Sequence, residues 1–141
     1  MGVEVRVRGT AKLAAEIGLL KGRLPRVVKQ AARDAAKPVL RDTKAMVPIG
    51  PAKGGHAKSS LRIVTSRGGI AIRGGGGRFP YYPWLEFGGG VGRNKRTFRQ
   101  RAPGGRYLFP ALRANRANIE KAMNRNIVRA ARDSGFKVRS R

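Results

Sequence analysis

Six basic residues fall in a glycine-rich stretch without an acidic residue, residues 88–106. They are Arg93, Lys95, Arg96, Arg99, Arg101 and Arg106. Guanidinium and ammonium groups bind phosphate, and contacts to the phosphate backbone carry no base sequence information. Phe98 in the same stretch could stack on a base, although it has no second aromatic beside it. The stretch therefore predicts a long mobile basic loop that contacts a polyanion without reading sequence.

More basic residues recur at helical spacing near the C-terminus. Arg125, Arg129 and Arg132 fall opposite an apolar stripe in a helix predicted over residues 109–133. A helix predicted over residues 26–47 has a similar basic face. Each face is either a solvated helix surface or a polyanion contact, and the sequence leaves both alternatives open.

The charge of the whole chain favours polyanion contact. The 141 residues include 32 Lys and Arg against 7 Asp and Glu, which gives a formal net charge of +25. Charge of one sign repels itself and attracts polyanions, with DNA as the natural partner. A cationic membrane-surface protein needs a concentrated basic amphipathic face, whereas this charge is spread along the chain. No apolar run reaches membrane-helix length and the start MGVEVRVRGT has no secretory pattern, so no membrane partner is expected.

The signals for enzymatic chemistry are weak. His56 is the single histidine and lies in a glycine-rich segment. Residues 50–59 (GPAKGGHAKS) have two glycines at phosphate-loop spacing, but the Lys-Ser pair comes two residues too late. The acidic residues are scattered, and the chain has no cysteine. We therefore predict that the chain is not an enzyme and has no catalytic, cofactor-binding or metal-binding residues.

Glu86 is unusual because it is an acidic residue among aromatic residues, in the segment YYPWLEFG at 81–88. A catalytic carboxylate needs a partner, and none is visible nearby. A structural role is the better interpretation, with Glu86 accepting hydrogen bonds from an arginine, a backbone turn or a neighbouring subunit. The segment predicts a subunit interface at Tyr82, Trp84, Glu86 and Phe87.

The periodicity predicts a single α+β domain over residues 1–141, with a small antiparallel sheet packed against two or three amphipathic helices. Strands are expected near residues 3–8, 61–66, 69–73 and 81–87, and helices near 10–24, 26–47 and 109–133. Pro38 predicts a kink or a restart in the second helix. Gly68 and Gly69 predict a hairpin. Residues 134–141 are expected to form a disordered basic tail.

Three short segments together resemble a known family. Residues 46–48 (MVP), followed by a glycine-rich loop and residues 55–61 (GHAKSSL), are similar to an "APxxTGxLxxSI" signature that follows a helix. Residues 82–88 (YPWLEFG) resemble "YAxxxEFGT", and residues 107–112 (YLFPAL) resemble "PFLxPAL". These signatures, in this order, are found in the tail-completion or head–tail joining proteins of long-tailed bacteriophages, and the resemblance covers roughly residues 10–133.

The resemblance implies a non-enzymatic virion protein at the phage neck or the head-proximal tail end, present in the host cytoplasm during assembly. It implies a ring of identical copies, a hexamer by analogy with the family, around the channel that holds double-stranded DNA. The implied protein partners are tail terminator or tail tube proteins and head-closure (stopper) or adaptor proteins. The alternative function is a stand-alone, sequence-nonspecific nucleic-acid-binding protein.

Overall fold

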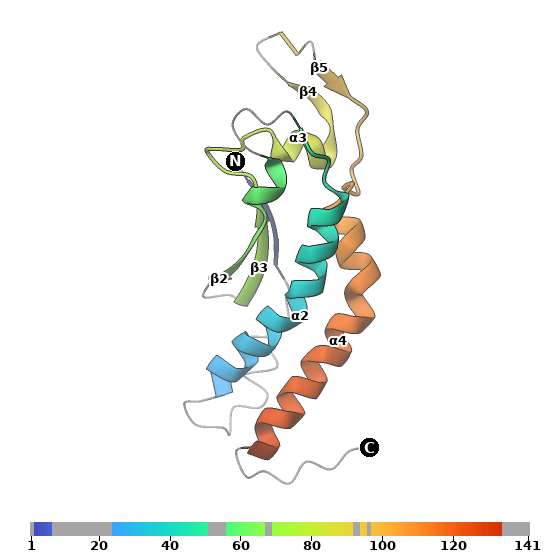
Figure 1. Cartoon of the computed structure of the whole chain (residues 1–141). Helices are drawn as coiled ribbons and strands as arrows, with labels where there is room; N and C mark the ends of the chain where they lie inside the picture. The colour runs from blue at the N-terminus through green and yellow to red at the C-terminus, as the bar shows by residue number, and fades with distance from the viewer. Residues whose placement is uncertain are drawn as a thin grey trace.

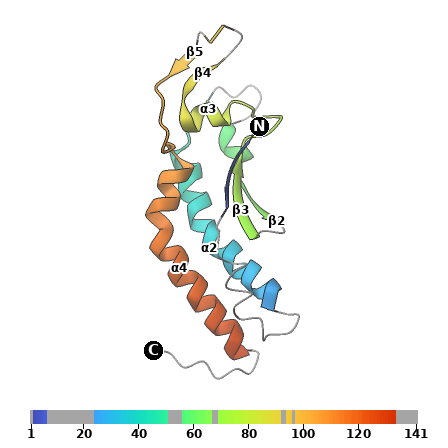
Figure 2. The ribbon, with the colours of Figure 1, turned by 180° about the vertical axis from the view of Figure 1, so that it is seen from behind.

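Two long helices dominate the structure. The computed structural model describes residues 2–6, 24–50, 56–66, 69–91, 94–95 and 97–133. The helices α2 (Leu24–Met46) and α4 (Leu108–Asp133) run antiparallel, and α2 lies between α4 and a small sheet (Figures 1 and 2). The beginning of α2 and the end of α4 extend beyond the sheet as a two-helix arm. The fold is α+β, as predicted.

The sheet has three antiparallel strands in the order β1-β3-β2. Its strands are β1 (Val3–Arg6), β2 (Arg62–Ser66) and β3 (Gly69–Gly74), which confirms three of the predicted strands. Ser66 pairs with Gly69, so β2 and β3 form the predicted hairpin. Ile70 and Ile72 are buried on the central strand. Ala71 between them is also buried, so the central strand is covered on both faces.

The helix α2 is continuous and rich in alanine. Ala31, Ala32, Ala35 and Ala36 are all buried, and such small side chains allow α2 to approach the sheet on one side and α4 on the other. Pro38 lies inside the helix without a restart. It removes one backbone hydrogen bond, and the ribbon of α2 changes direction along its length (Figure 1).

The helix α4 closes the core. Leu108, Ala111 and Met123 are buried and belong to the same hydrophobic cluster as Val28 and Val39 of α2. Pro110 lies in the first turn, where a missing backbone N–H has no helical partner to lose. The two helices predicted over 26–47 and 109–133 are confirmed. The helix predicted over 10–24 and the tail 134–141 fall outside the described residues, apart from residue 24, which begins α2.

The strand predicted over 81–87 is wrong, because this segment forms the short helix α3 (Tyr82–Phe87). Pro83 has the backbone φ angle that suits a first helical turn. Gly88 ends the helix at a φ of 75°, and its N–H donates to the carbonyl oxygen of Trp84 at 2.8 Å. Aromatic side chains favour strands only weakly, and these start and stop residues outweighed them.

The stretch 88–106 contains regular structure that the sequence did not reveal. The strands β4 (Gly89–Val91) and β5 (Thr97–Arg99) pair antiparallel and extend from the end of the molecule that carries α3 (Figure 1). The prediction of an unbroken loop is therefore wrong at β4 and β5. A short 3-10 helix, η1 (Ala57–Ser60), precedes β2.

Candidate nucleic-acid interface

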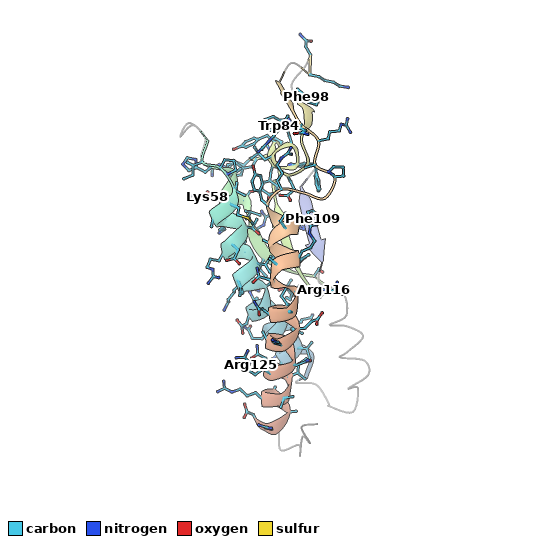
Figure 3. The ribbon with its side chains drawn as sticks, turned by 90° about the vertical axis from the view of Figure 1, so that its right-hand side faces the viewer. Lys58, Trp84, Phe98, Phe109, Arg116 and Arg125 are labelled. Atoms are coloured by element: carbon cyan, nitrogen blue, oxygen red, sulfur yellow. The ribbon has the colours of Figure 1, made fainter. Side chains whose placement is uncertain are left out.

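The basic residues predicted in 88–106 have different surroundings. Lys95 and Arg101 are exposed, and Phe98 on β5 is 68% exposed. Figure 3 shows Phe98 on the hairpin, farther from α4 than Trp84. Arg93 and Arg96 lie outside the described residues. Lys95, Arg101 and Phe98 are thus the members of this stretch that the structure leaves accessible to a partner.

Arg99 is held by its own chain. Its Nη2 donates to the Tyr107 hydroxyl at 2.6 Å, and its Nη1 donates to the Leu85 carbonyl at 3.2 Å. Its guanidinium carbon also lies 5.8 Å from the ring centre of Trp84 and 5.6 Å from that of Tyr107. These cation–π contacts and hydrogen bonds fix β5 to α3 and to the start of α4. Arg99 therefore has a structural role, which the sequence analysis missed.

Arg106 also points back to the chain. Its Nη2 donates to the Gln100 carbonyl, and its Nη1 is buried. A guanidinium in this position bridges the two ends of the connection between β5 and α4. Arg106 is consequently less available to a phosphate than Lys95 or Arg101.

The predicted contact residues on α4 are exposed. Arg125, Arg129 and Arg132 all lie on the solvent side of the helix. In Figure 3, Arg125 and Arg116 extend to opposite sides of α4. Arg116 is 3.4 Å from Glu120, an exposed pair on the other side of the helix. The row at Arg125 is therefore a basic surface distinct from the ion-paired side of α4.

Glu86 caps the N-terminus of α4. Its side chain is 0% exposed. Its Oε1 accepts from the backbone N–H groups of Tyr107 at 3.2 Å, Leu108 at 3.1 Å and Phe109 at 3.4 Å. These N–H groups have no partner within the helix, and the positive end of the helix dipole also favours a negative group. Glu86 therefore has the structural role predicted for it, with a backbone turn as the donor.

The hydroxyl of Tyr82 completes this site. It donates to Glu86 Oε2 at 3.2 Å from one turn earlier on α3. Burial, followed by the charge of Glu86 and this hydrogen bond, raises the pKa of Tyr82 far above its ordinary value. Tyr82 is thus a neutral donor, and its ring packs within the core.

Tyr82 and Glu86 are wholly buried within the chain, so their side chains do not reach the surface. Of the four residues predicted at a subunit interface, only Trp84 and Phe87 are partly exposed. Trp84 Nε1 donates to the Gly89 carbonyl at 2.7 Å, and Phe87 packs 5.5 Å from Phe109, measured between ring centres. An interface at this segment would have to use the remaining exposed edges of Trp84 and Phe87.

Asp42 and Asn115 join α2 to α4. Asn115 Nδ2 donates to Asp42 Oδ2 at 2.9 Å and to the Ala111 carbonyl at 2.9 Å. Arg41 also donates to Asp42 at 3.0 Å. The hydrogen bond from Asn115, followed by that from Arg41, holds the pKa of Asp42 below its ordinary value.

This contact predicts a pH-dependent contribution to stability. The folded protein binds the Asp42 proton less tightly than the unfolded chain does, so the contribution is complete above about pH 4 and is lost as the pH falls further. We expect Asn115→Ala to lower the urea midpoint more at pH 6 than at pH 2.5. Asn118→Ala, an exposed change on the same helix, should lower it equally at both values. A midpoint difference for Asn115→Ala that stays constant with pH would contradict the role of Asp42.

The described residues offer little support for a metal site or for acid–base catalysis. Within them, no group of three His, Asp or Glu side chains comes together as a possible metal site. His56 immediately precedes η1, and the carboxylates of Asp34 and Asp42 are occupied by neighbouring side chains. No helix in this part of the chain is long and apolar enough to cross a membrane.

Comparisons with protein-family models, with curated proteins and with solved structures find no match to this chain.

Proposed function

We propose that this chain is a structural, non-enzymatic subunit at the neck or head-proximal tail end of a long-tailed phage, where it completes the tail and joins it to the DNA-filled head. The observation that carries the proposal is its unbalanced basic surface. Exposed arginines line α4, while Asp34, Asp42, Glu86 and Glu120 are already bonded within the chain. Such a surface suits a protein beside DNA whose sequence it does not read.

The position of Glu86 supports this proposal in a second way. It links residues 82–88 to residues 107–112, two of the segments that carry the resemblance to tail-completion proteins. Their contact is structural, because the carboxylate is occupied by backbone N–H groups. A carboxylate that only holds two segments of the chain together fits a scaffold subunit better than an enzyme.

The proposed partners are other copies of the chain in a ring, a hexamer by analogy with the family, together with tail terminator or tail tube proteins on one side. Head-closure (stopper) or adaptor proteins would lie on the other side, and double-stranded DNA would pass through the ring. The proposed place in the virion is the neck.

The same basic surface favours a second candidate, a stand-alone nucleic-acid-binding protein. The two functions differ in affinity. A stand-alone protein should bind duplex DNA tightly as an isolated chain, with a strong salt dependence, whereas a ring subunit should bind only weakly until it is assembled with its partners.

Loss of the protein tests the joining role directly. In a phage with an early stop codon in this gene, we expect DNA-filled heads and separate tails of finished length in electron micrographs of the lysate. Expression of the intact gene from a plasmid should restore joined particles. Complete infectious virions without the protein would contradict the proposed function.

A further inference from the structure

Two rows of exposed basic side chains run along the helices α2 and α4. The row on α2 is Arg26, Lys29, Arg33, Lys37 and Arg41, and the row on α4 is Lys121, Arg125, Arg129 and Arg132. Residues spaced three or four apart lie on one side of a helix. Each row is therefore a continuous basic stripe.

The row on α4 and the Arg41 end of the row on α2 face the same side of the helix pair. Arg33 faces the sheet instead, where its Nη1 donates to the Thr65 hydroxyl at 3.2 Å. Asp42 and Asn115 mark the seam where the helices touch. Counting about 100° per residue, Arg41 lies about 100° back from Asp42, and Arg125 lies about 80° back from Asn115. Because the helices are antiparallel, the same sense of rotation from the seam leads to the same face (Figure 1).

The core confirms this arrangement. Val39 lies about 60° forward of Asp42, and Met123 lies about 80° forward of Asn115, in the opposite sense to Arg41 and Arg125. Both side chains are buried in the same hydrophobic cluster. Lys37 and Arg41 of α2 therefore share an outer face with Lys121, Arg125, Arg129 and Arg132 of α4, and we name it the α2–α4 basic face.

The α2–α4 basic face is extended and is poorly neutralised along α4. Its row on α4 is about 16 Å long, at 1.5 Å per residue. On α2, Lys37 binds Asp34 at 2.6 Å and Arg41 binds Asp42 at 3.0 Å, so these two charges are partly neutralised. The ion pair described on α4 joins Arg116 to Glu120, outside its basic row, so the charges of that row repel one another. A bound polyanion would relieve this repulsion.

The residue types on this face identify the polyanion. The helix α2 contains no aromatic residue, and on α4 the aromatic residue is Phe109 in the first turn. The face therefore cannot stack unpaired bases, which single-strand binding requires. It also lacks large apolar side chains between its charges, which a membrane-surface helix needs. A rigid row about 16 Å long spans about five base pairs of duplex DNA at 3.4 Å each.

We propose that the α2–α4 basic face binds the phosphate backbone of double-stranded DNA. This inference rests on the proposed function and names the surface that contacts the channel DNA. The proposed contact is with phosphates, which carry no base-sequence information.

The salt dependence of binding tests the proposal, since it counts the phosphates engaged. The probe is a fluorescent 24-base-pair duplex of arbitrary sequence, titrated with the full chain at salt concentrations from 50 to 200 mM. We expect Arg125→Gln with Arg129→Gln to weaken binding about tenfold or more at 0.1 M salt. It should also make the slope of log K against log salt shallower by about 2, or 0.9 per lost contact.

A second pair tests the α2 row, and a third serves as the control. Lys37→Gln with Arg41→Gln should make the slope shallower by less than 2, because these two side chains are already ion-paired with Asp34 and Asp42. The control, Arg78→Gln with Arg116→Gln, removes the same charge from an exposed residue between β3 and α3 and from the ion-paired side of α4. It should leave the slope unchanged. Thermal melting of each variant establishes that it is folded.

Equal changes of slope in the face variants and the control would overturn the proposal. So would absence of duplex binding by the wild-type chain at 50 mM salt, or equal binding of an acidic polypeptide in place of the duplex. These outcomes are distinct from failure of the joining role. A chain that binds DNA through this face but whose loss leaves virions intact would refute only the phage function.

Discussion

Replacing Glu86 with alanine is expected to lower the free energy of unfolding by about 3–5 kcal/mol, because several buried hydrogen-bond donors lose their acceptor together. The change leaves the N–H groups of Leu108 and Phe109 and the hydroxyl of Tyr82 without their acceptor. An unpaired buried polar group costs about 1–3 kcal/mol. A domain of this size has only about 5–15 kcal/mol in total, so the loss is a large fraction of its stability.

Urea unfolding followed by circular dichroism measures this effect. Glu86→Gln keeps the shape of the side chain and one acceptor, so it should lower the free energy of unfolding less than the alanine variant does. The matched control is Glu120→Ala, which removes an exposed carboxylate 3.4 Å from Arg116 and should cost at most about 0.5 kcal/mol. Faster hydrogen exchange at Leu108 and Phe109 would locate the change. Equal stability of the Glu86 and Glu120 variants would contradict the capping role.

The cap has a consequence for the rest of the molecule. Glu86 fixes the start of α4 against α3, and the contact between Asn115 and Asp42 fixes the same helix against α2 farther along. The direction of α4, and with it the position of Arg125 and Arg129, depends on these two polar contacts as well as on the hydrophobic core. The buried side chain of Glu86 thus helps to position the surface that is proposed to bind DNA.

Periodicity along the sequence was enough to predict the main elements. Alternating residues predicted β1, β2 and β3, although β3 is in fact buried at four consecutive residues. The apolar stripes predicted α2 and α4, because burial of one side of a helix enforces the helical period. The sequence predicted that Glu86 is structural but not what it contacts. Besides Tyr82, its donors are backbone N–H groups more than twenty residues away, and every residue type other than proline provides such a group.

Short elements were harder to predict. The aromatic residues of α3 predict a strand, although Pro83 and Gly88 are signals for the start and the end of a helix. The strands β4 and β5 have three residues each, too few for alternation to show. Arg99 was assigned to phosphate because its charge is visible in the sequence, whereas the rings of Trp84 and Tyr107 that hold it are brought together only by the fold.

Gly88→Ala is the second substitution with a large expected effect, a loss of about 3–5 kcal/mol from backbone strain and overpacking together. Gly88 has φ 75° and ψ −160°, a backbone region that is almost exclusive to glycine. An added Cβ would meet the Gln100 carbonyl oxygen at an impossible separation. The obstacle is backbone, so relief requires moving the connection after β5 away from α3.

Trp84 reports this movement, since it is the only tryptophan in the chain and it packs beside Arg99. We expect Gly88→Ala to shift its fluorescence emission to longer wavelength and to lower the urea midpoint. Gly89→Ala is the matched control, because Gly89 also has a positive φ, of 102°, but its added Cβ meets no atom within 4 Å. The control carries backbone strain alone, about 1–2 kcal/mol. The larger loss for Gly88→Ala then measures how tightly the β4–β5 hairpin is fixed to α3, and equal losses for the two variants would show that the hairpin moves aside freely.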